Sequence, residues 1–354
     1  MKVIKPFGFT RRSTLYLGRA LAIAITFYMA LGAVRTADAQ KFRFFGNTIS
    51  DWTVITLPAG GTTLRWRILK NENPSVAPGI IRDIPFGADA TDLAAAAGDY
   101  TGDGLDDFAL YRDATGSPAN TYLIGRSDGG TIFQPWGDSS IDNIGNEGDY
   151  DGDHKMDFSI ARGSDGSPYQ WWVLRSSNNT VAVFEWGQFD TDIPLAGADY
   201  TGDGIDDPTV ARVNPTTGLI TWYVGTITGS QISQVQWGDF DTDFIVPAGD
   251  YDGDHKADYM VWRGFGTVNG VWYLRTSAGA TSYTQFGLAS GVAANRDIAL
   301  RSGDYDADGK TDIAIYRPST LTFWVLRSSG GGAQTQPWGV AGNSNVPLAQ
   351  LGTF

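Results

Sequence analysis

One aspartate-rich segment of nine residues occurs five times along this chain of 354 residues. The copies begin 50, 50, 51 and 54 residues apart, which is too regular for chance. A period of this length predicts an array of similar structural units, each packed against its neighbours. The segments, named loops 1 to 5 in chain order, are residues 99–107, 149–157, 199–207, 250–258 and 304–312.

Oxygen-bearing side chains occupy positions 1, 3, 5 and 9 of every loop, and position 7 offers its backbone carbonyl. A hard cation such as Ca²⁺ takes about six to eight oxygen ligands, and this spacing can wrap around one. The sequence therefore predicts up to five Ca²⁺ sites. The predicted ligands are Asp99, Thr101, Asp103, Leu105 and Asp107 in loop 1; Asp149, Asp151, Asp153, Lys155 and Asp157 in loop 2; Asp199, Thr201, Asp203, Ile205 and Asp207 in loop 3; Asp250, Asp252, Asp254, Lys256 and Asp258 in loop 4; and Asp304, Asp306, Asp308, Lys310 and Asp312 in loop 5.

The loops differ at three positions that bear on metal binding. Position 3 is threonine in loops 1 and 3 and aspartate elsewhere, so loops 2, 4 and 5 are expected to bind calcium more tightly. Asp106 and Asp206, at position 8 of loops 1 and 3, are expected to compensate at longer range. Position 6 is glycine or histidine, which suits a positive φ angle. His154 and His255 are therefore interpreted as turn residues rather than catalytic or transition-metal residues.

An EF-hand calcium loop begins with a similar run of aspartates but ends differently. It places a bidentate glutamate at position 12 and is flanked by helices. Here each loop is followed by a short apolar segment, such as Phe108–Arg112 or Ile313–Arg317, which is typical of a buried strand. The EF-hand interpretation is excluded because the position-12 residues are Leu110, Ile160, Val210, Val261 and Ile315.

The Asp-x-Asp-x-Asp-Gly-x-x-Asp loop between two strands, recurring at this period, resembles the FG-GAP/VCBS repeat of integrin-like β-propellers. The resemblance covers essentially the whole chain after its leader. It implies a propeller scaffold with structural calcium and surface recognition, but no single activity. A second marker, an aromatic residue followed by glycine, occurs at Phe86, Trp136, Trp186, Trp237, Phe286 and Trp338. A third, an aromatic residue that opens a short apolar strand, occurs at Trp66, Tyr122, Trp172, Trp222, Trp272 and Trp324.

These markers count six units, although there are five calcium loops. The first unit has Arg43, Phe45 and Asn47 where positions 1, 3 and 5 would lie, so no cage is expected there. Residues 346–354 match the start of a unit, so the last strand is expected to complete the first blade. We predict an all-β, six-bladed β-propeller with calcium loops in five blades and the first blade completed by the C-terminal strand. The units of this single domain, 40–354, are approximately 40–97, 98–147, 148–197, 198–248, 249–302 and 303–354.

Residues 1–39 are predicted to be a cleaved signal peptide. Basic residues precede an uncharged run at 20–34, and Ala37-Asp38-Ala39 offers a cleavage site with small residues. Fifteen apolar residues are short for a membrane span. The protein is therefore expected to be secreted, periplasmic or at the cell surface, with no stable membrane span after cleavage. The chain has no cysteine, so neither a disulfide framework nor a thiolate metal site is expected.

The charge of the chain argues against nucleic acid as a partner. The formal net charge is −13, and removal of a leader with six basic residues and one acidic residue would change it to −18. No basic stripe exists that could displace counterions from phosphates. We therefore expect a protein, cell-surface or glycan ligand, and we expect the propeller to be a monomer.

An arginine recurs at position 14, counted from the start of each loop. A ring of guanidinium groups could form an anion site, but stacking on aromatic residues and pairing with loop carboxylates is favoured. Because both histidines lie in loops, no Ser/His/Asp set is expected, and no aspartate outside the loops stands out as an acid or base. The arginines are Arg112, Arg162, Arg212, Arg263 and Arg317.

Three function classes remain. The favoured one is an exported calcium-binding β-propeller that acts as a non-catalytic recognition or adhesion scaffold. The alternatives are a carbohydrate-binding lectin of the same fold and, less favoured, a polysaccharide lyase or hydrolase. In each blade the calcium loop and the loop between the third and fourth strands are expected to share one face. Partners are expected on the opposite face, where the enlarged connection 288–300 is the strongest candidate contact.

Overall fold

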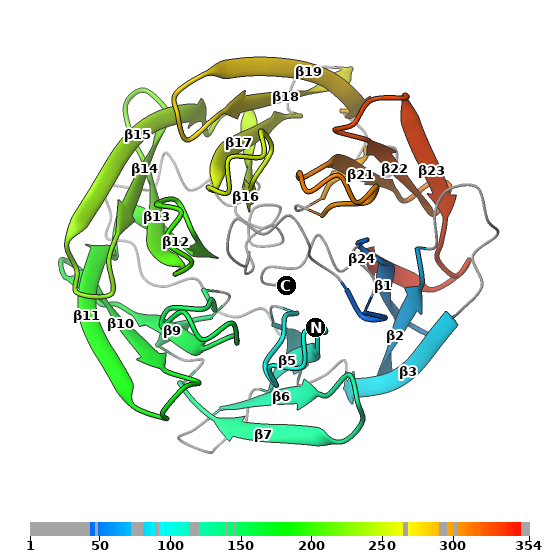
Figure 1. Ribbon diagram of the computed structural model, residues 1–354, viewed down its shortest axis with the longest axis horizontal. Helices are drawn as coiled ribbons and strands as arrows, with labels where there is room; N and C mark the ends of the chain where they lie inside the picture. Colours follow the sequence, from blue (N-terminus) through cyan, green and yellow to red (C-terminus); the bar gives the residue numbers. More distant parts are fainter. Residues whose placement is uncertain are drawn as a thin grey trace.

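The computed structural model forms six small antiparallel sheets arranged in a ring, a six-bladed β-propeller (Figure 1). Every regular element in the described part of the chain is a β-strand, so the predicted all-β fold class is confirmed. The structure describes residues 43–46, 49–71, 81–88, 92–95, 97–112, 120–138, 141–144, 146–264, 268–289, 296–300 and 303–347. The predicted signal peptide, residues 1–39, lies outside these ranges.

Each sheet contains four strands and forms one blade, with its fourth strand at the perimeter of the ring (Figure 1). Blade 1 contains β24 (Ser344–Pro347), β1 (Trp52–Leu57), β2 (Thr63–Leu69) and β3 (Ile81–Ala88). Blade 2 contains β4 (Asp92–Ala94), β5 (Phe108–Arg112), β6 (Thr121–Gly125) and β7 (Thr131–Pro135). Blade 3 contains β8 (Asp142–Asn143), β9 (Phe158–Arg162), β10 (Pro168–Leu174) and β11 (Val181–Gln188).

The other three blades repeat this arrangement, so that loops 1 to 5 lie in blades 2 to 6, each between the first and second strands. Blade 4 contains β12 (Asp192–Ala198), β13 (Asp207–Val213), β14 (Leu219–Gly225) and β15 (Gln231–Asp239). Blade 5 contains β16 (Asp243–Gly249), β17 (Asp258–Arg263), β18 (Asn269–Arg275) and β19 (Thr281–Leu288). Blade 6 contains β20 (Ile298–Ala299), β21 (Ile313–Arg317), β22 (Thr322–Leu326) and β23 (Ala333–Pro337). None of the described segments is a helix long and apolar enough to cross a membrane.

The ring is closed within blade 1, which joins the two ends of the described chain. Strand β24 pairs antiparallel with β1, with Val54 opposite Pro347 and Leu57 opposite Ser344. The prediction that the C-terminal strand completes the first blade is therefore confirmed. Closure in this way pairs an edge of β1 that would otherwise be open to another chain.

A large buried aromatic side chain on the third strand forms the centre of each blade. In four blades its indole N–H donates to the carbonyl of the aromatic–Gly pair, as from Trp171 to Trp186 at 2.9 Å and from Trp222 to Trp237 at 2.9 Å. The same bond is made by Trp66 and Trp272. The buried residues are Trp66, Tyr122, Trp171, Trp222, Trp272 and Phe323.

The third sequence marker coincides with this central residue in four of the six blades. Trp172 and Trp324 are half-buried, whereas their neighbours Trp171 and Phe323 hold the central position. The hairpin between the central residue and the aromatic–Gly pair differs in length from blade to blade. Because side chains alternate along a strand, a shift of one residue places a side chain on the opposite face.

A closed ring of backbone hydrogen bonds joins the six blades on the side where loops 1 to 5 lie. At each junction the N–H at position 8 of one unit donates to the carbonyl at position 1 of the unit before it. Asp206 N donates to Asp149 O at 2.8 Å, and blade 1 takes part through Ser50 N, which donates to Asp304 O at 2.7 Å. The remaining bonds run from Asp106 to Arg43, Met156 to Asp99, Ala257 to Asp199 and Thr311 to Asp250. Neighbouring loops are therefore in direct contact.

Candidate metal centres

The aspartate at position 1 organises each loop by accepting backbone N–H groups. In loop 2, Oδ1 of Asp149 accepts from Gly152 at 2.7 Å and from Asp153 at 3.2 Å, and Oδ2 accepts from His154 at 2.7 Å. This wrapping requires positive φ angles at positions 4 and 6, and His154 has φ 67° while His255 has φ 66°. The interpretation of the two histidines as turn residues is confirmed.

The aspartate at position 9 ties the loop to the hairpin between the third and fourth strands. Asp157 Oδ2 accepts the N–H of Tyr150 at 3.0 Å, and Oδ1 accepts the N–H of Ser176 at 2.7 Å. Ser176 Oγ then donates to Asp153 Oδ1, at position 5, at 2.8 Å. The hairpin therefore lies against the loop, which confirms that the two share one face.

Sequence reasoning missed these hairpin hydroxyls. Each of these serines is the second residue after the end of the third strand. The pair Arg-Ser or Thr-Ser recurs there at the repeat period, and this recurrence could have identified the serines from the sequence. In blade 4 the corresponding residue is Ile227, so loop 3 lacks the hydroxyl. The serines that donate to a position-5 carboxylate are Ser127, Ser176, Ser277 and Ser328.

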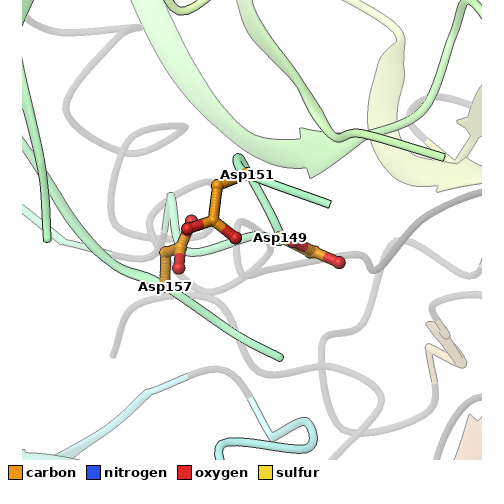
Figure 2. A group of neighbouring side chains, drawn as sticks. All are labelled: Asp149, Asp151 and Asp157. Carbon is orange, nitrogen blue, oxygen red and sulfur yellow. The ribbon is translucent and has the colours of Figure 1, made fainter. Parts of the chain in front are cut away.

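Three loops bring together carboxylates that could hold a metal ion. In loop 2, oxygens of Asp149, Asp151 and Asp157 lie within 4.8 Å of one another (Figure 2). The other two groups are Asp250, Asp252 and Asp254 in loop 4, and Asp304, Asp306 and Asp308 in loop 5. These are the three loops with aspartate at position 3. Within the described residues, the carboxylates of loops 1 and 3 form no such group of three.

Not every predicted ligand belongs to these groups. Asp153 in loop 2, Asp258 in loop 4 and Asp312 in loop 5 lie outside them. The position-7 residues contribute their backbone N–H to the loop, as when Lys155 donates to Asp153 Oδ1 at 2.9 Å and Lys310 to Asp308 Oδ1 at 2.9 Å.

The electrostatics of the loops favour a bound cation. Burial, followed by repulsion from the other loop aspartates, raises the pKa of Asp157 and Asp258 to about 7. The same causes raise the pKa of Asp207 and Asp312 to about 7 and that of Asp107 to about 6. A carboxylate that is buried beside like charges is stabilised by a cation, which would lower these pKa values again.

The position-8 aspartates do not face the loops to which they belong. Asp206 Oδ2 accepts the N–H of Asp149, in loop 2, at 2.8 Å, and Asp106 Oδ2 accepts the N–H of Arg43, in blade 1, at 3.1 Å. Both side chains therefore hydrogen-bond to the preceding unit, and the expectation that they compensate loops 1 and 3 at longer range stays a prediction. Position 8 lies at the junction between blades, and its side chain follows its backbone N–H toward the preceding unit.

In blades 2 to 6, at the end away from loops 1 to 5, a buried aspartate pairs with the recurring arginine. Arg162 donates from Nε and Nη2 to the two oxygens of Asp142 at 2.7 and 2.9 Å. Asp142 Oδ2 also accepts the N–H of Asp138, in the connection between blades, at 2.7 Å. This bidentate pair joins two strands and the connection. The five pairs are Asp92–Arg112, Asp142–Arg162, Asp192–Arg212, Asp243–Arg263 and Asp297–Arg317.

The prediction for these arginines is half right. Stacking on an aromatic ring is confirmed in four blades, for example Arg212 over Tyr223 at 4.6 Å and Arg317 over Trp324 at 4.7 Å. The carboxylate partner is not in a metal loop, however. It is a separate aspartate seven residues before each loop. Its recurrence at the repeat period was visible in the sequence.

Comparison with protein-family models finds no match, and neither does comparison with curated proteins. Among solved structures, the chain is similar to a protein of unknown function from Bacteroides caccae, with 8% sequence identity and a TM-score of 0.36. The matched region covers 78% of this chain and 83% of that chain. The FG-GAP/VCBS resemblance therefore rests on the loops and markers of this chain alone.

Proposed function

We propose that this protein is an exported, calcium-stabilised β-propeller of the FG-GAP/VCBS type that acts as a non-catalytic recognition or adhesion scaffold. The propeller fold fits such a role because it presents two broad loop faces on a closed frame. Loops 1 to 5 lie on one face, and the arginine–aspartate pairs lie at the opposite end of blades 2 to 6. The export signal, which rests on the sequence of residues 1–39, is part of the proposal.

The observation that carries the calcium proposal is a buried carboxylate oxygen in loop 2. Asp151 Oδ2 accepts a hydrogen bond from Ser177 Oγ at 2.5 Å. Within the described part of the chain, Asp151 Oδ1 is buried and accepts none. A buried carboxylate oxygen without a partner is costly, and a cation beside Asp149 and Asp157 would satisfy it. The donor set is all oxygen, which suits Ca²⁺.

Calcium in these loops would neutralise the carboxylates and cross-link the first and second strands of each blade. At ~1 mM free calcium, a site with an affinity of ~0.1 mM contributes about 1.4 kcal/mol. Five such sites contribute at most about 7 kcal/mol, which is comparable to the net stability of a typical domain.

The test is a melting curve in 2 mM calcium chloride and in excess EDTA, with 2 mM magnesium chloride as the ionic control. For a chain of this size we expect the melting temperature to fall by about 10 °C on calcium removal and to recover when calcium is restored. A melting temperature that does not respond to calcium would contradict the proposal.

Recognition is proposed to occur on the face opposite the metal loops. Of the enlarged connection 288–300, residues 290–295 lie outside the described residues, but both ends of the connection are held. Leu288 N donates to Asp297 Oδ2 at 2.7 Å, and Asp297 N donates to Leu288 O at 2.9 Å. Replacement of residues 290–295 by a short Gly-Ser turn should abolish capture of the partner from the cell envelope while leaving the melting curve unchanged.

A carbohydrate-binding role is the second candidate, and one observation favours it. Tyr283, on the perimeter strand β19, is 76% exposed and lies beside Tyr273, with 6.4 Å between the ring centroids. The guanidinium carbon of Arg263 lies over the Tyr273 ring, 4.6 Å from its centroid. An exposed aromatic pair of this kind can stack on a sugar ring. Glycan binding that is lost in Tyr283→Ala would support this function over the scaffold role.

A further inference from the structure

The side chain at position 7 of each loop lies over the preceding loop rather than over its own. Lys310, in loop 5, extends across Gly253 of loop 4, where a Cβ atom would lie 2.9 Å from Lys310 Cε. Its ammonium group donates to the carbonyl of Asp252, also in loop 4, at 2.8 Å. A positive charge from blade 6 therefore sits on the carboxylate-bearing loop of blade 5.

The same contact recurs around the ring, but the charge of the side chain varies. Lys155 lies over Gly102 of loop 1, and Lys256 lies over Gly202 of loop 3, 3.0 Å from a Cβ placed there. Loop 2 is instead covered by Ile205, whose Cγ1 atom lies 3.1 Å from a Cβ at Gly152. The unit that follows loop 5 in the ring is blade 1, and its residue at position 7 is the uncharged Ile49.

One further contact distinguishes loops 2 and 5 from the other loops among the described residues, and another is made by loop 2. A second hairpin hydroxyl reaches the position-3 carboxylate in these loops, from Ser177 to Asp151 and from Ser329 to Asp306. Loop 2 also receives the carboxylate of Asp206 from the next blade, as described above. Loops 2 and 5 therefore combine four aspartates with an uncharged residue at position 7 of the next unit, whereas loop 4 has four aspartates and Lys310.

From these contacts we infer that the calcium affinity of each loop is set in part by the blade that follows it, and that the loops fill in a defined order. Loops 2 and 5 bind first, loop 4 follows, and loops 1 and 3, which have threonine at position 3 and a covering lysine, bind last. The inference rests on the proposed calcium binding. Its physical basis is that a fixed positive charge close to a cation site raises the free energy of the bound ion.

The direct test counts bound ions by native mass spectrometry while free calcium is raised from the micromolar to the millimolar range. We expect two ions, then a third, then up to five. In Lys310→Met the third ion should bind at a calcium concentration lower by on the order of tenfold. An unchanged third step would overturn the inference, as would simultaneous binding of all ions in the natural protein.

Two matched variants locate the effect. Asp254→Asn disables loop 4, so adding Lys310→Met to it should no longer shift any step; a shift that persists would overturn the assignment to loop 4. Asp206→Asn should weaken one of the first two steps, because Asp206 faces loop 2. A change in the last two steps instead would show that Asp206 acts on its own loop 3. If no ion binds at millimolar calcium, the proposed function fails, and that result is distinct from binding without order.

Discussion

Blades 1 and 3 have the same four-stranded frame, but only blade 3 has an aspartate-rich loop whose carboxylates could hold a metal ion. Asp157 in blade 3 accepts the N–H groups of Tyr150 and Ser176. Asp51 in blade 1 occupies the same position and accepts the N–H groups of Phe44 at 2.9 Å and Asn71 at 3.0 Å. The ninth aspartate therefore supports the backbone in both blades, whether or not carboxylates surround it.

The opposite ends of the two blades differ in a matching way. Blade 3 joins its first two strands through the Asp142–Arg162 ion pair. Blade 1 has Asn345 opposite Thr56 at the same place in the sheet. Asn345 Oδ1 accepts the N–H of Val340 at 2.7 Å, as Asp142 accepts that of Asp138. The aspartate and the arginine are thus replaced together, because either one alone would leave a buried charge without its partner.

The comparison distinguishes the features that all six blades share from those that blade 1 lacks. The frame, which consists of the ninth residue, the central aromatic side chain and the ring of backbone bonds, is present in all six blades. The carboxylate cluster and the ion pair are additions that blade 1 lacks. Blade 1 instead contains the pairing of β24 with β1 that closes the ring.

The largest effect is expected where the ion pair of blade 3 is broken on one side only. Arg162→Thr leaves Asp142 fully buried without its partner and should cost about 3 kcal/mol of unfolding free energy. The double variant Asp142→Asn with Arg162→Thr copies blade 1 and should recover more than half of that loss. Urea unfolding in saturating calcium measures both, and a double variant no more stable than the single one would contradict the account.

A smaller effect is expected from the pH dependence of blade 1. Burial raises the pKa of Asp51 from 3.8 to about 7, with a further contribution from the charge of Asp106. Because the folded state favours the protonated form, the stability that Asp51 provides is complete below pH 3.8 and is lost as the pH rises through 7. Relative to Asp51→Asn, the natural protein should therefore lose about 2 kcal/mol of unfolding free energy between pH 5 and pH 8.

This measurement is made by urea unfolding in saturating calcium, so that the loop aspartates contribute equally to the natural protein and to Asp51→Asn. A gap between the two proteins that stays constant with pH, or that moves in favour of the natural protein at pH 8, would show that Asp51 is ionised in the fold.

The smallest effect is expected from the hairpin hydroxyls. Ser176→Ala removes the donor to Asp153 Oδ1 and should reduce calcium-dependent stabilisation by about 0.5 to 1 kcal/mol. Thr180→Ala is the matched control, because its hydroxyl lies in the same hairpin and donates to Asn178 instead. Calcium titration followed by thermal unfolding compares the two variants. Equal effects of the two substitutions would contradict a role for the Ser176 hydroxyl in calcium-dependent stabilisation.

Much of the fold followed from local patterns that repeat. The nine-residue loops set the period, the apolar segments after them predicted the second strands, and the match of residues 346–354 to a unit start predicted closure through β24. These features were readable because each lies within a few residues of a recognisable loop or marker.

Features that depend on contacts between distant residues were not predicted. Asp142 lies 20 residues before Arg162, and the pair is visible only once β8 and β9 are placed side by side. The direction of Asp206 depends on how two blades meet. Burial of Trp171 rather than Trp172 depends on the length of the hairpin, which the repeat does not fix. Periodicity predicts the unit, but not the geometry of the contacts between units.

The most direct test of the account is amide hydrogen exchange, followed residue by residue, in calcium and in EDTA. The account predicts that calcium removal accelerates exchange by at least about tenfold at Gly152 and His154 in blade 3, whose N–H groups are held by Asp149. Exchange at Phe44 and Asn71 in blade 1 should change by no more than about twofold, since Asp51 holds them without a metal. Equal acceleration in both blades, or none in blade 3, would contradict the separation of frame and metal loop.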